Sequence, residues 1–594
     1  MMTSEYPRIV ELESKISLAN IISFDFFDTL FVRPLCHPED AFDVLAKRFG
    51  IDNFRKLRKT AQTAAFQRMH ERGRKEISLA DIYECFPATN VPANILMQAE
   101  YDLELALVYP NPELIEVFNR AVSAGKKVVV TSDMYLTEDF FVKAFDQYGI
   151  KQVPMFISAE KNATKRDAGE LFTVLAKSLN VPCESILHIG DNEHADVKQA
   201  QAKNIQAFHY LQSRQVPQLK QYSPEASAAL GLIQLQGAEM VSGSVAESGF
   251  LYGGPATFAF LRWIEQQATK DKVDHVLFVS RDGYLLNRIV EGGALSNLPR
   301  SCYFFGSRTA FTLASITDTN FISYLPFLLS GADELSPFEL LARIGVPAPP
   351  AELMDAFGLG DGTRVNLGDT VNLQRFLYAY RWEILKVCRR NRQGLFNYLL
   401  ELGLDSGQKV ALVDVGWNGS TQESFESALN GLMDLDVHGY YFCLADTPEC
   451  AQRRSKYHMS ALFSVDSVSP EVIADIYKNR VTIEMFFSAP HNTVIGLEST
   501  PSGVVAIEDP GRGTGDKILA SVDELVEGGK LFFEAYESLL QTMDFPFDCV
   551  AIASPMIEFA TNNSWHQSAI FSEMDNFDTW ASSENKKLNL SDYV

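Results

Sequence analysis

Residues 21–30 read IISFDFFDTL and residues 186–196 read ILHIGDNEHAD, and these two stretches decide the fold of the N-terminal part of the chain. Each begins with a short apolar run that turns polar at an aspartate, Asp25 in the first and Asp191 in the second. Such runs predict buried strands of an α/β sheet. An aspartate at the carboxyl end of a strand projects into the crevice where open α/β sheets bind ligands.

Asp25 can attack phosphorus as a carboxylate nucleophile, which splits one difficult transfer into two easier steps. A strand-end aspartate alone is more often a helix cap or a turn residue, so the prediction needs further elements. Three of them follow in the sequence. A second apolar strand, 127–131, ends at Ser132 and Asp133, where a hydroxyl and adjacent amides can hold phosphate oxygens at a helix N-terminus.

The other two elements supply charge. Lys165 is expected to open a helix, where its ammonium could offset the charge of an aspartate and a phosphoryl group. Asp191 and Asp196 belong to a GDxxxxD stretch after a predicted strand. Magnesium prefers one or two carboxylates together with waters and phosphate oxygens, and this loop can supply the carboxylates.

In order and spacing, these four elements resemble the four motifs of the haloacid dehalogenase-like (HAD) superfamily. The resemblance implies a Rossmann-like sheet, Mg²⁺ as cofactor and an aspartyl-phosphate mechanism. It implies the following roles: Asp25 as nucleophile and metal ligand, Ser132 with Asp133 and Thr29 as substrate-binding residues, Lys165 as the neutralising charge, Asp191 as metal ligand, Asp196 as direct or indirect metal partner, and the backbone carbonyl of Phe27 as a further ligand.

The chain departs from the family's phosphatases at Phe27, where they have an aspartate that protonates the leaving group. Losing a general acid costs roughly 10²–10⁴ in rate. Asp28 follows directly and could substitute, although its side chain is expected to point elsewhere. A slow phosphatase, a transferase that uses a good leaving group and a binding remnant therefore all stay open. An aromatic residue here is similar to the haloacid dehalogenases, but dehalogenation needs no metal, whereas Asp191 and Asp196 suit one.

Between the first two motifs, residues 34–110 have a helical pattern, and the resemblance implies a C1 cap that closes over the site. This segment carries a basic cluster in an acidic protein, made up of Arg55, Lys56, Arg58, Lys59, Arg68, Arg72, Arg74 and Lys75. The cluster could steer an anionic substrate. The other interpretation, a solvated helix face with intrahelical ion pairs, is the commoner one for runs of charge.

The domain prediction places a HAD-like domain at 15–212, a linker at 213–245 and a second α/β domain at 246–594. The second domain is expected to contain a helical insertion at about 317–404 and a hairpin at 492–507. Two of its strands end in motifs, SRDG at 280–283 and DVGWNGS at 414–420. Gly416, Gly419 and Ser420 could present amides to an anion, with Arg308 adding a guanidinium. The alternative is that these residues only make tight turns.

The 76 acidic residues outnumber the 52 basic ones, which argues against a nucleic-acid-binding surface. Scattered cysteines, no signal-peptide pattern and no long apolar run predict a cytoplasmic protein without an integral membrane segment. Over nearly its full length the sequence resembles large bacterial HAD hydrolases whose genes occur with surface-polysaccharide functions. The function expected is an Mg²⁺-dependent phosphatase or phosphotransferase on a small phosphorylated metabolite, with polysaccharide-biosynthesis partners implied. The alternative is an impaired HAD module in binding or regulation, with the second domain a ligand-binding or transferase unit.

Overall fold

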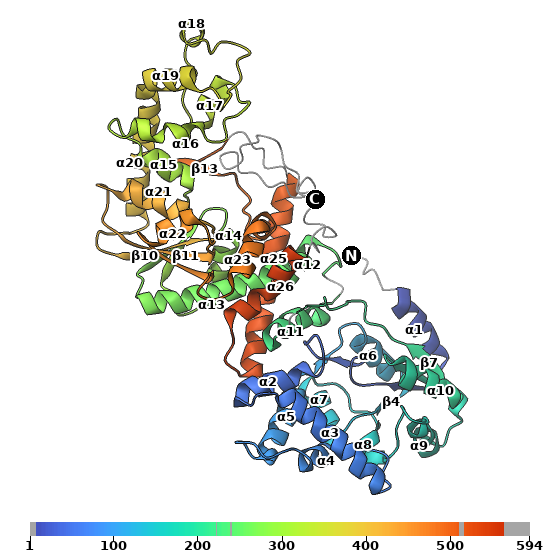
Figure 1. Cartoon of the computed structure of the whole chain (residues 1–594). Helices are drawn as coiled ribbons and strands as arrows, with labels where there is room; N and C mark the ends of the chain where they lie inside the picture. The colour runs from blue at the N-terminus through green and yellow to red at the C-terminus, as the bar shows by residue number, and fades with distance from the viewer. Residues whose placement is uncertain (1–6, 221, 238–239, 510–515, 563–594) are drawn as a thin grey trace. The chain divides into compact units, whose positions relative to one another are not determined.

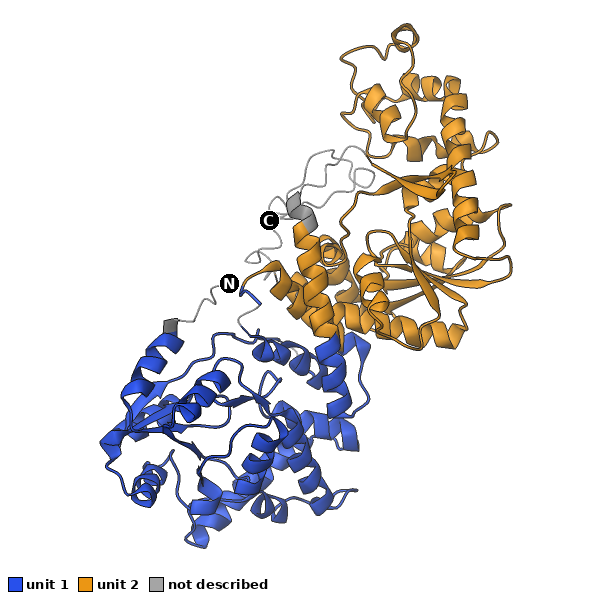
Figure 2. Cartoon of the chain, turned by 180° about the vertical axis from the view of Figure 1, so that it is seen from behind, with its two compact units in different colours: residues 1–242, 534–551 blue, residues 243–533, 552–594 orange. Residues whose placement is uncertain are grey.

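The computed structural model describes residues 7–220, 222–237, 240–509 and 516–562 (Figure 1). The chain divides into two compact units (Figure 2). The first comprises residues 1–242 and 534–551, and the second comprises residues 243–533 and 552–594. The sequence contains no signal for the return of residues 534–551 to the first unit. The boundaries derived from the sequence at 212 and 246 stay a prediction.

The first unit is built on a five-stranded parallel sheet, which confirms the expected α/β class. Its strand order is β5-β4-β1-β6-β7, with β5 at Met155–Ile157, β4 at Lys127–Ser132, β1 at Ile21–Phe24, β6 at Ile186–Gly190 and β7 at Gln206–His209. In chain order this is 3-2-1-4-5, the order of a doubly wound sheet without its sixth strand. The strand order reverses between β1 and β6, so their carboxyl ends form the expected ligand crevice.

Helices cover both faces of this sheet, as they must where strands are apolar on both sides. They are α1 (Pro7–Leu18), α6 (Ile115–Ser123), α7 (Glu138–Gln147), α8 (Ser158–Lys161), α9 (Glu170–Leu179) and α10 (Gln199–Ala202), with the short turns η1 (Cys183–Ser185) and η2 (Glu193–Lys198). Helix α11 (Pro224–Gly231) and the turn η3 (Leu232–Leu235) follow. One buried cluster joins β1 and β4 to α9 through residues such as Ile21, Val129 and Phe172.

The segment between the sheet strands β1 and β4 is helical, as its pattern predicts. A short antiparallel pair, β2 (Phe31–Val32) with β3 (Tyr109–Pro110), closes its base. Between them lie α2 (Asp40–Phe49), α3 (Phe54–Glu71), α4 (Leu79–Glu84) and α5 (Ala93–Leu107). Its role as a cap stays a prediction.

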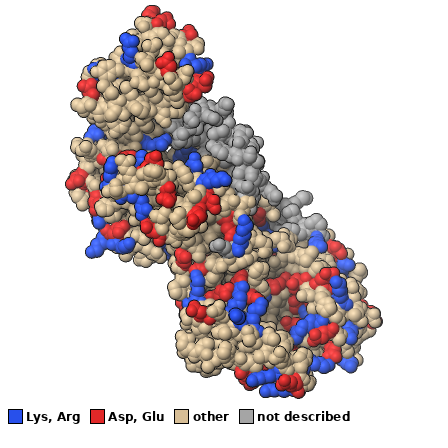
Figure 3. Space-filling model, viewed as in Figure 1, with Lys and Arg blue, Asp and Glu red and all other residues tan. Residues whose placement is uncertain are grey.

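The basic cluster of this segment forms ion pairs. Arg58 is fully buried, and its Nε and Nη2 each lie 2.6 Å from the Glu100 carboxylate. The other pairs are Arg55 with Asp40 and Asp43, Lys59 with Glu39, Arg72 and Arg74 with Asp81, and Lys75 with Glu170. Figure 3 shows Lys and Arg interspersed with Asp and Glu on the face it draws. Six of the eight residues therefore form ion pairs, but the expectation of a solvated face with intrahelical pairs is wrong, because Arg58 is buried and the pairs join different elements.

The second unit has its own parallel sheet, ordered β12-β11-β10-β8-β9. Its strands are β8 (His275–Val279), β9 (Arg300–Phe304), β10 (Lys409–Asp414), β11 (Asp436–Cys443) and β12 (His458–Phe463). In chain order this is 2-1-3-4-5, so the second unit does not repeat the topology of the first. Its flanking helices include α12 (Val245–Ser248), α13 (Gly254–Asp271), α14 (Tyr284–Glu291), α21 (Ser420–Leu429), α22 (Pro448–Arg454), α23 (Pro470–Lys478) and α24 (Arg480–Met485), with the turn η4 (Gly249–Gly253).

The predicted helical insertion is present between β9 and β10. It contains α15 (Arg308–Ser315), η5 (Phe321–Tyr324), α16 (Leu325–Leu329), α17 (Pro337–Arg343), α18 (Ala351–Ala356), α19 (Val371–Ala379) and α20 (Arg381–Glu401). Much of it packs around a buried core of its own that includes Phe321, Leu340 and Phe376. The predicted hairpin is present as β13 (Val494–Thr500) with β14 (Gly503–Glu508). Strand β13 packs closely on α20, because a Cβ at Gly394 of α20 would collide with the backbone of Leu497 in β13.

Helices α25 (Asp516–Met543) and α26 (Cys549–Thr561) complete the described chain. Among the residues that the structure describes, none of the helices is both long and apolar enough to cross a membrane.

The buried pair between Arg58 and Glu100 gives a test of the helical segment. We expect Arg58→Met to destabilise the first unit by about 3–5 kcal/mol, because it leaves a buried carboxylate without its cation. Scanning calorimetry of the full chain should show one unfolding transition with a lowered midpoint.

The matched control is Arg68→Met at an exposed position of the same helix, which should change stability by less than about 0.5 kcal/mol. Adding Glu100→Leu to Arg58→Met should recover part of the loss, because no unpaired charge then remains. Equal midpoints for Arg58→Met and Arg68→Met would contradict the buried pair.

Candidate active site

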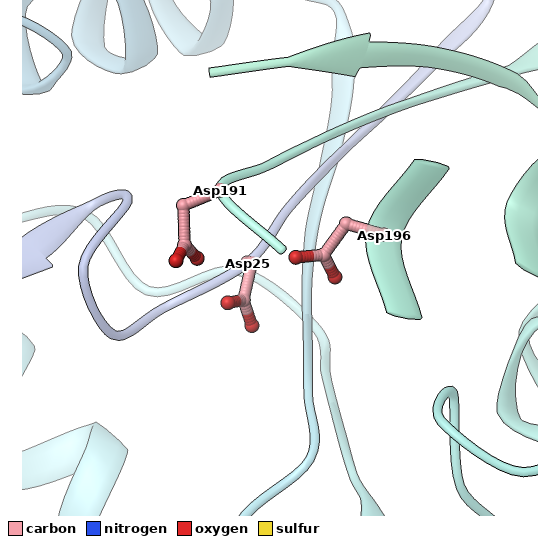
Figure 4. A group of neighbouring side chains, drawn as sticks. All are labelled: Asp25, Asp191 and Asp196. Atoms are coloured by element: carbon pink, nitrogen blue, oxygen red, sulfur yellow. The ribbon is translucent and has the colours of Figure 1, made fainter. Parts of the chain in front are cut away.

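Three aspartates meet at the carboxyl edge of the first sheet. Asp25 follows β1, Asp191 follows β6 and Asp196 lies in the turn η2. One carboxylate oxygen from each lies within 4.8 Å of the others, and Figure 4 shows the side chains converging. The two strands are direct neighbours in the sheet, with Phe24 opposite Ile189. The crevice predicted from the sequence therefore contains the three predicted acidic residues.

The ammonium of Lys165 lies among these carboxylates. Its Nζ is 2.8 Å from Asp25 Oδ1 and 2.5 Å from Asp196 Oδ1, and the side chain is almost completely buried. Burial acts against the charge, but Asp196 and Asp25 raise the pKa of Lys165, so the ammonium stays protonated. The prediction that Lys165 opens a helix is wrong, because α9 begins only at Glu170 and Lys165 lies in the preceding loop.

Asp133 holds that loop in place. Its carboxylate accepts hydrogen bonds from the backbone N of Lys165 at 2.8 and 2.9 Å and from the backbone N of Arg166 at 2.9 Å. Ser132, the last residue of β4, is buried beside it. The expected helix N-terminus is not at this place, because α7 starts at Glu138. Asp133 thus contacts the lysine loop, and its role toward a substrate, like that of Ser132, stays a prediction.

A second anchor connects the loop to the helical segment. Glu76 is buried and receives both terminal nitrogens of Arg166, at 2.8 and 2.9 Å. It also accepts a hydrogen bond from Ser158 Oγ at 2.8 Å. A bidentate arginine–carboxylate pair fixes orientation as well as distance. Glu76 and Arg166 therefore tie the residue next to Lys165 to the segment between β2 and β3, a link that no sequence motif indicates.

Both oxygens of Asp196 have partners within the protein. Oδ1 contacts Lys165 and lies 3.1 Å from His188 Nε2, and Oδ2 accepts the backbone N of Asn192 at 2.9 Å. His188 is buried in β6, and its Nδ1 is 2.8 Å from Ser23 Oγ. Burial lowers the pKa of His188, which favours the neutral ring. This arrangement favours an indirect role for Asp196, in which it positions Lys165.

Burial and the neighbouring carboxylates disfavour the ionised forms of Asp25 and Asp191. Burial raises the pKa of Asp25 to about 8, against the opposing effect of Lys165, and Asp196 and Asp191 raise it further. Burial and the neighbouring Asp28 raise the pKa of Asp191 to about 6. The Thr29 hydroxyl, fully buried, donates to Asp191 Oδ1 at 3.2 Å. Thr29 therefore contacts a predicted metal ligand.

Phe27 is the residue at which the sequence departs from the resemblance, and it is packed into an aromatic group. Its ring lies 4.8 Å from the Phe26 centroid and 6.0 Å from that of Phe140. The guanidinium of Arg33 lies 4.7 Å over the same ring, and its Nη2 is 3.3 Å from Asp28 Oδ2. Asp28 has a left-handed backbone conformation, with φ of 55°. The Asp28 carboxylate is thus paired with Arg33.

In the second unit, the two motifs also lie at strand ends. Ser307, near Arg308, caps α15, since its Oγ accepts the backbone N of Ala310 at 3.1 Å. Asn418, from the loop after β10, accepts a hydrogen bond from Thr447 at 2.7 Å and donates to the Tyr477 hydroxyl at 3.3 Å. Thr447 and Tyr477 also line a pocket of about 430 Å³, together with Asp446 and Glu471 among others.

No protein-family model matches this sequence, and no curated protein matches it. Solved structures of HAD-type hydrolases are similar to about a third of the chain. A dehalogenase with an intermediate complex is 12% identical, covers 34% of this chain and 89% of its own, and has a TM-score of 0.25. A HAD phosphatase from Thermococcus onnurineus is 16% identical over 33% of this chain and 87% of its own, with a TM-score of 0.24.

The putative HAD-hydrolase YfnB from Bacillus subtilis, solved bound to magnesium, is 16% identical. The match covers 34% of this chain and 90% of that protein, with a TM-score of 0.24. At these identities and scores the likeness says nothing about which reaction this chain performs. The functional conclusion therefore rests on the geometry of the site.

Proposed function

We propose that the first unit is a magnesium-dependent phosphatase or phosphotransferase that forms an aspartyl phosphate on Asp25. One observation carries the proposal: Asp25 is buried at the strand reversal, hydrogen-bonded to a buried lysine and adjacent to a second carboxylate, Asp191. A nucleophile, a fixed positive charge and a candidate cation ligand thus share one crevice.

The donor set fits a magnesium ion. When all three carboxylates are ionised, the one ammonium leaves two negative charges, which a divalent cation would balance. Asp25 and Asp191 are the residues that would hold the ion, because both oxygens of Asp196 already have protein partners. Bound magnesium would polarise phosphoryl oxygens and favour the ionised form of Asp25. The backbone carbonyl of Phe27 is the further metal ligand that the resemblance implies.

In the proposed reaction, Lys165 occupies Oδ1 of Asp25, so Oδ2 is the oxygen that attacks phosphorus. As this bond forms, the bond from phosphorus to the leaving oxygen breaks, and the leaving group keeps the electron pair. Water, or an acceptor alcohol in a transferase, then attacks the same phosphorus, its hydroxyl loses a proton to solvent, and Asp25 departs as a carboxylate. The Lys165 ammonium offsets the negative charge in both steps.

The weak point of this site is proton donation to the leaving group. Phe27 cannot donate a proton, and Asp28 is paired with Arg33. This favours substrates with good leaving groups. It equally favours a second candidate, in which the unit binds a phosphorylated ligand with little turnover and serves in regulation. The resemblance described above suggests a sugar phosphate or another polysaccharide precursor as the substrate.

The contact between Thr29 and Asp191 predicts an effect on magnesium affinity. Thr29→Val keeps the volume of the side chain but removes the hydroxyl that orients Asp191. We expect the magnesium concentration for half-maximal thermal stabilisation to rise roughly 10–100-fold. Thr29→Ser is the matched control and should behave like the unaltered protein. Identical magnesium titrations for the Val and Ser variants would show that Thr29 does not support a metal ligand.

The nucleophile and the missing acid are tested together with magnesium and two phosphate esters. The unaltered protein should hydrolyse an activated aryl phosphate faster than an alkyl phosphate by roughly 10²–10⁴, because no acid assists the poorer leaving group. Asp25→Asn should lower aryl phosphate turnover roughly a thousandfold or more.

Asp28→Asn is the control for the neighbouring carboxylate and should leave aryl phosphate hydrolysis nearly unchanged. If instead Asp25→Asn is as active as the unaltered protein, the aspartyl-phosphate mechanism fails. Tight binding of inorganic phosphate without any turnover would select the binding module.

A further inference from the structure

The sheet of the second unit has its own strand reversal. The chain passes from β8 to β9 on one side, and β10 lies on the other side of β8. Doubly wound sheets bind ligands outside the carboxyl ends of the two strands at such a reversal. Asp282 follows β8, and Asp414 is the last residue of β10. Both carboxylates therefore stand where this topology places a ligand.

The two carboxyl groups are close neighbours. Asp282 Oδ2 accepts a hydrogen bond from the backbone N of Val415 at 3.3 Å, so Asp282 reaches across to the end of β10. The side chain of Asp282 lies within hydrogen-bonding reach of the Asp414 carboxyl group. Two carboxyl groups that follow neighbouring strands are thus brought together.

Asp414 supplies an independent observation. It is 5% exposed, and its Oδ1 accepts the backbone N of Gly416 at 3.4 Å. Its Oδ2 is buried and has no hydrogen-bond partner within the described part of the chain, although the Asp282 carboxyl and the Thr421 hydroxyl lie near the same carboxylate. Buried acceptor oxygens nearly always have a hydrogen-bond or ionic partner, so this oxygen indicates a bound group that is not part of the protein.

The surrounding charges favour a cation as that group. Glu484 adds a further carboxylate near Asp414 and accepts the Trp417 indole N–H at 2.6 Å. Arg281 faces Asp282, and its Nη1 also donates to Thr493 Oγ1 at 3.2 Å. Three carboxyl groups face one guanidinium, and this arrangement opposes the anion site considered from the sequence.

The glycines of the β10 loop have packing reasons of their own. A Cβ at Gly416 would lie 2.6 Å from the Cys443 carbonyl oxygen. Gly419 has φ of 71°, and a Cβ there would collide with the Met459 side chain. These glycines thus let the loop pack closely against its neighbours and do not require a bound anion.

We propose that Asp282 and Asp414 form a divalent-cation site at the strand reversal of the second unit. Carboxylate oxygens alone suit a hard ion such as Mg²⁺, Mn²⁺ or Ca²⁺. Asp282 is half-buried, so the site is reachable from solvent, and water or an oxygen of a ligand would complete the coordination. The site is independent of the aspartates of the first unit.

The test is a Mn²⁺ titration of the full chain followed by electron paramagnetic resonance, which counts free ions. In a background of Asp25→Asn with Asp191→Asn, one bound Mn²⁺ per chain should remain. Adding Asp414→Asn or Asp282→Asn should weaken this binding roughly tenfold or more. Asp434→Asn is the control, because Asp434 is exposed and precedes β11 at the opposite end of the sheet.

A background protein that binds no Mn²⁺, or binding that survives both Asn variants, would overturn the proposal; the pair would then share only a proton. If only the first unit fails to bind metal, the result is different. The combined Asp25→Asn and Asp191→Asn variant would then bind as many Mn²⁺ ions per chain as the unaltered protein. A direct measurement needs no variant: crystals soaked in Mn²⁺ should give an anomalous peak between Asp282 and Asp414, and its absence would contradict the site.

Discussion

The candidate active site depends on the buried ammonium of Lys165 between Asp25 and Asp196. Without it, three carboxylates would share one crevice with no fixed positive charge. An unpaired buried charge is costly, so the ammonium permits the cluster to form at all. Lys165 is in turn held through its own backbone by Asp133. A buried cation in a loop held by hydrogen bonds is the arrangement expected where negative charge develops during a reaction.

Much of the first unit could be predicted from the sequence because its signals are local. Apolar strands that end in Asp25 and Asp191, together with a lysine and a second aspartate in the right order, indicate the sheet and its crevice. The supporting contacts could not be predicted, because they join residues far apart in the chain. Glu76 pairs with Arg166, and the Asp133 carboxylate accepts a hydrogen bond from the backbone N of Lys165, 32 residues later in the chain. Neither contact leaves a periodic pattern in the sequence.

The two errors at this site have the same physical origin. Ser132 and Lys165 were each expected at the N-terminus of a helix that follows directly. In the structure, α7 and α9 begin several residues later, at Glu138 and Glu170. Side-chain-to-backbone bonds, such as those of Asp133, stabilise the intervening loops instead. The strand order of the second sheet also lay beyond the sequence, since five parallel strands are compatible with several orders.

The central claim is that Asp25 itself receives the phosphoryl group. The most direct measurement is to quench the protein during turnover of an aryl phosphate, reduce it with borohydride and map the peptides by mass spectrometry. Reduction of an aspartyl phosphate gives homoserine, and the account predicts homoserine at position 25. Turnover without any homoserine, or homoserine at another position, would contradict it.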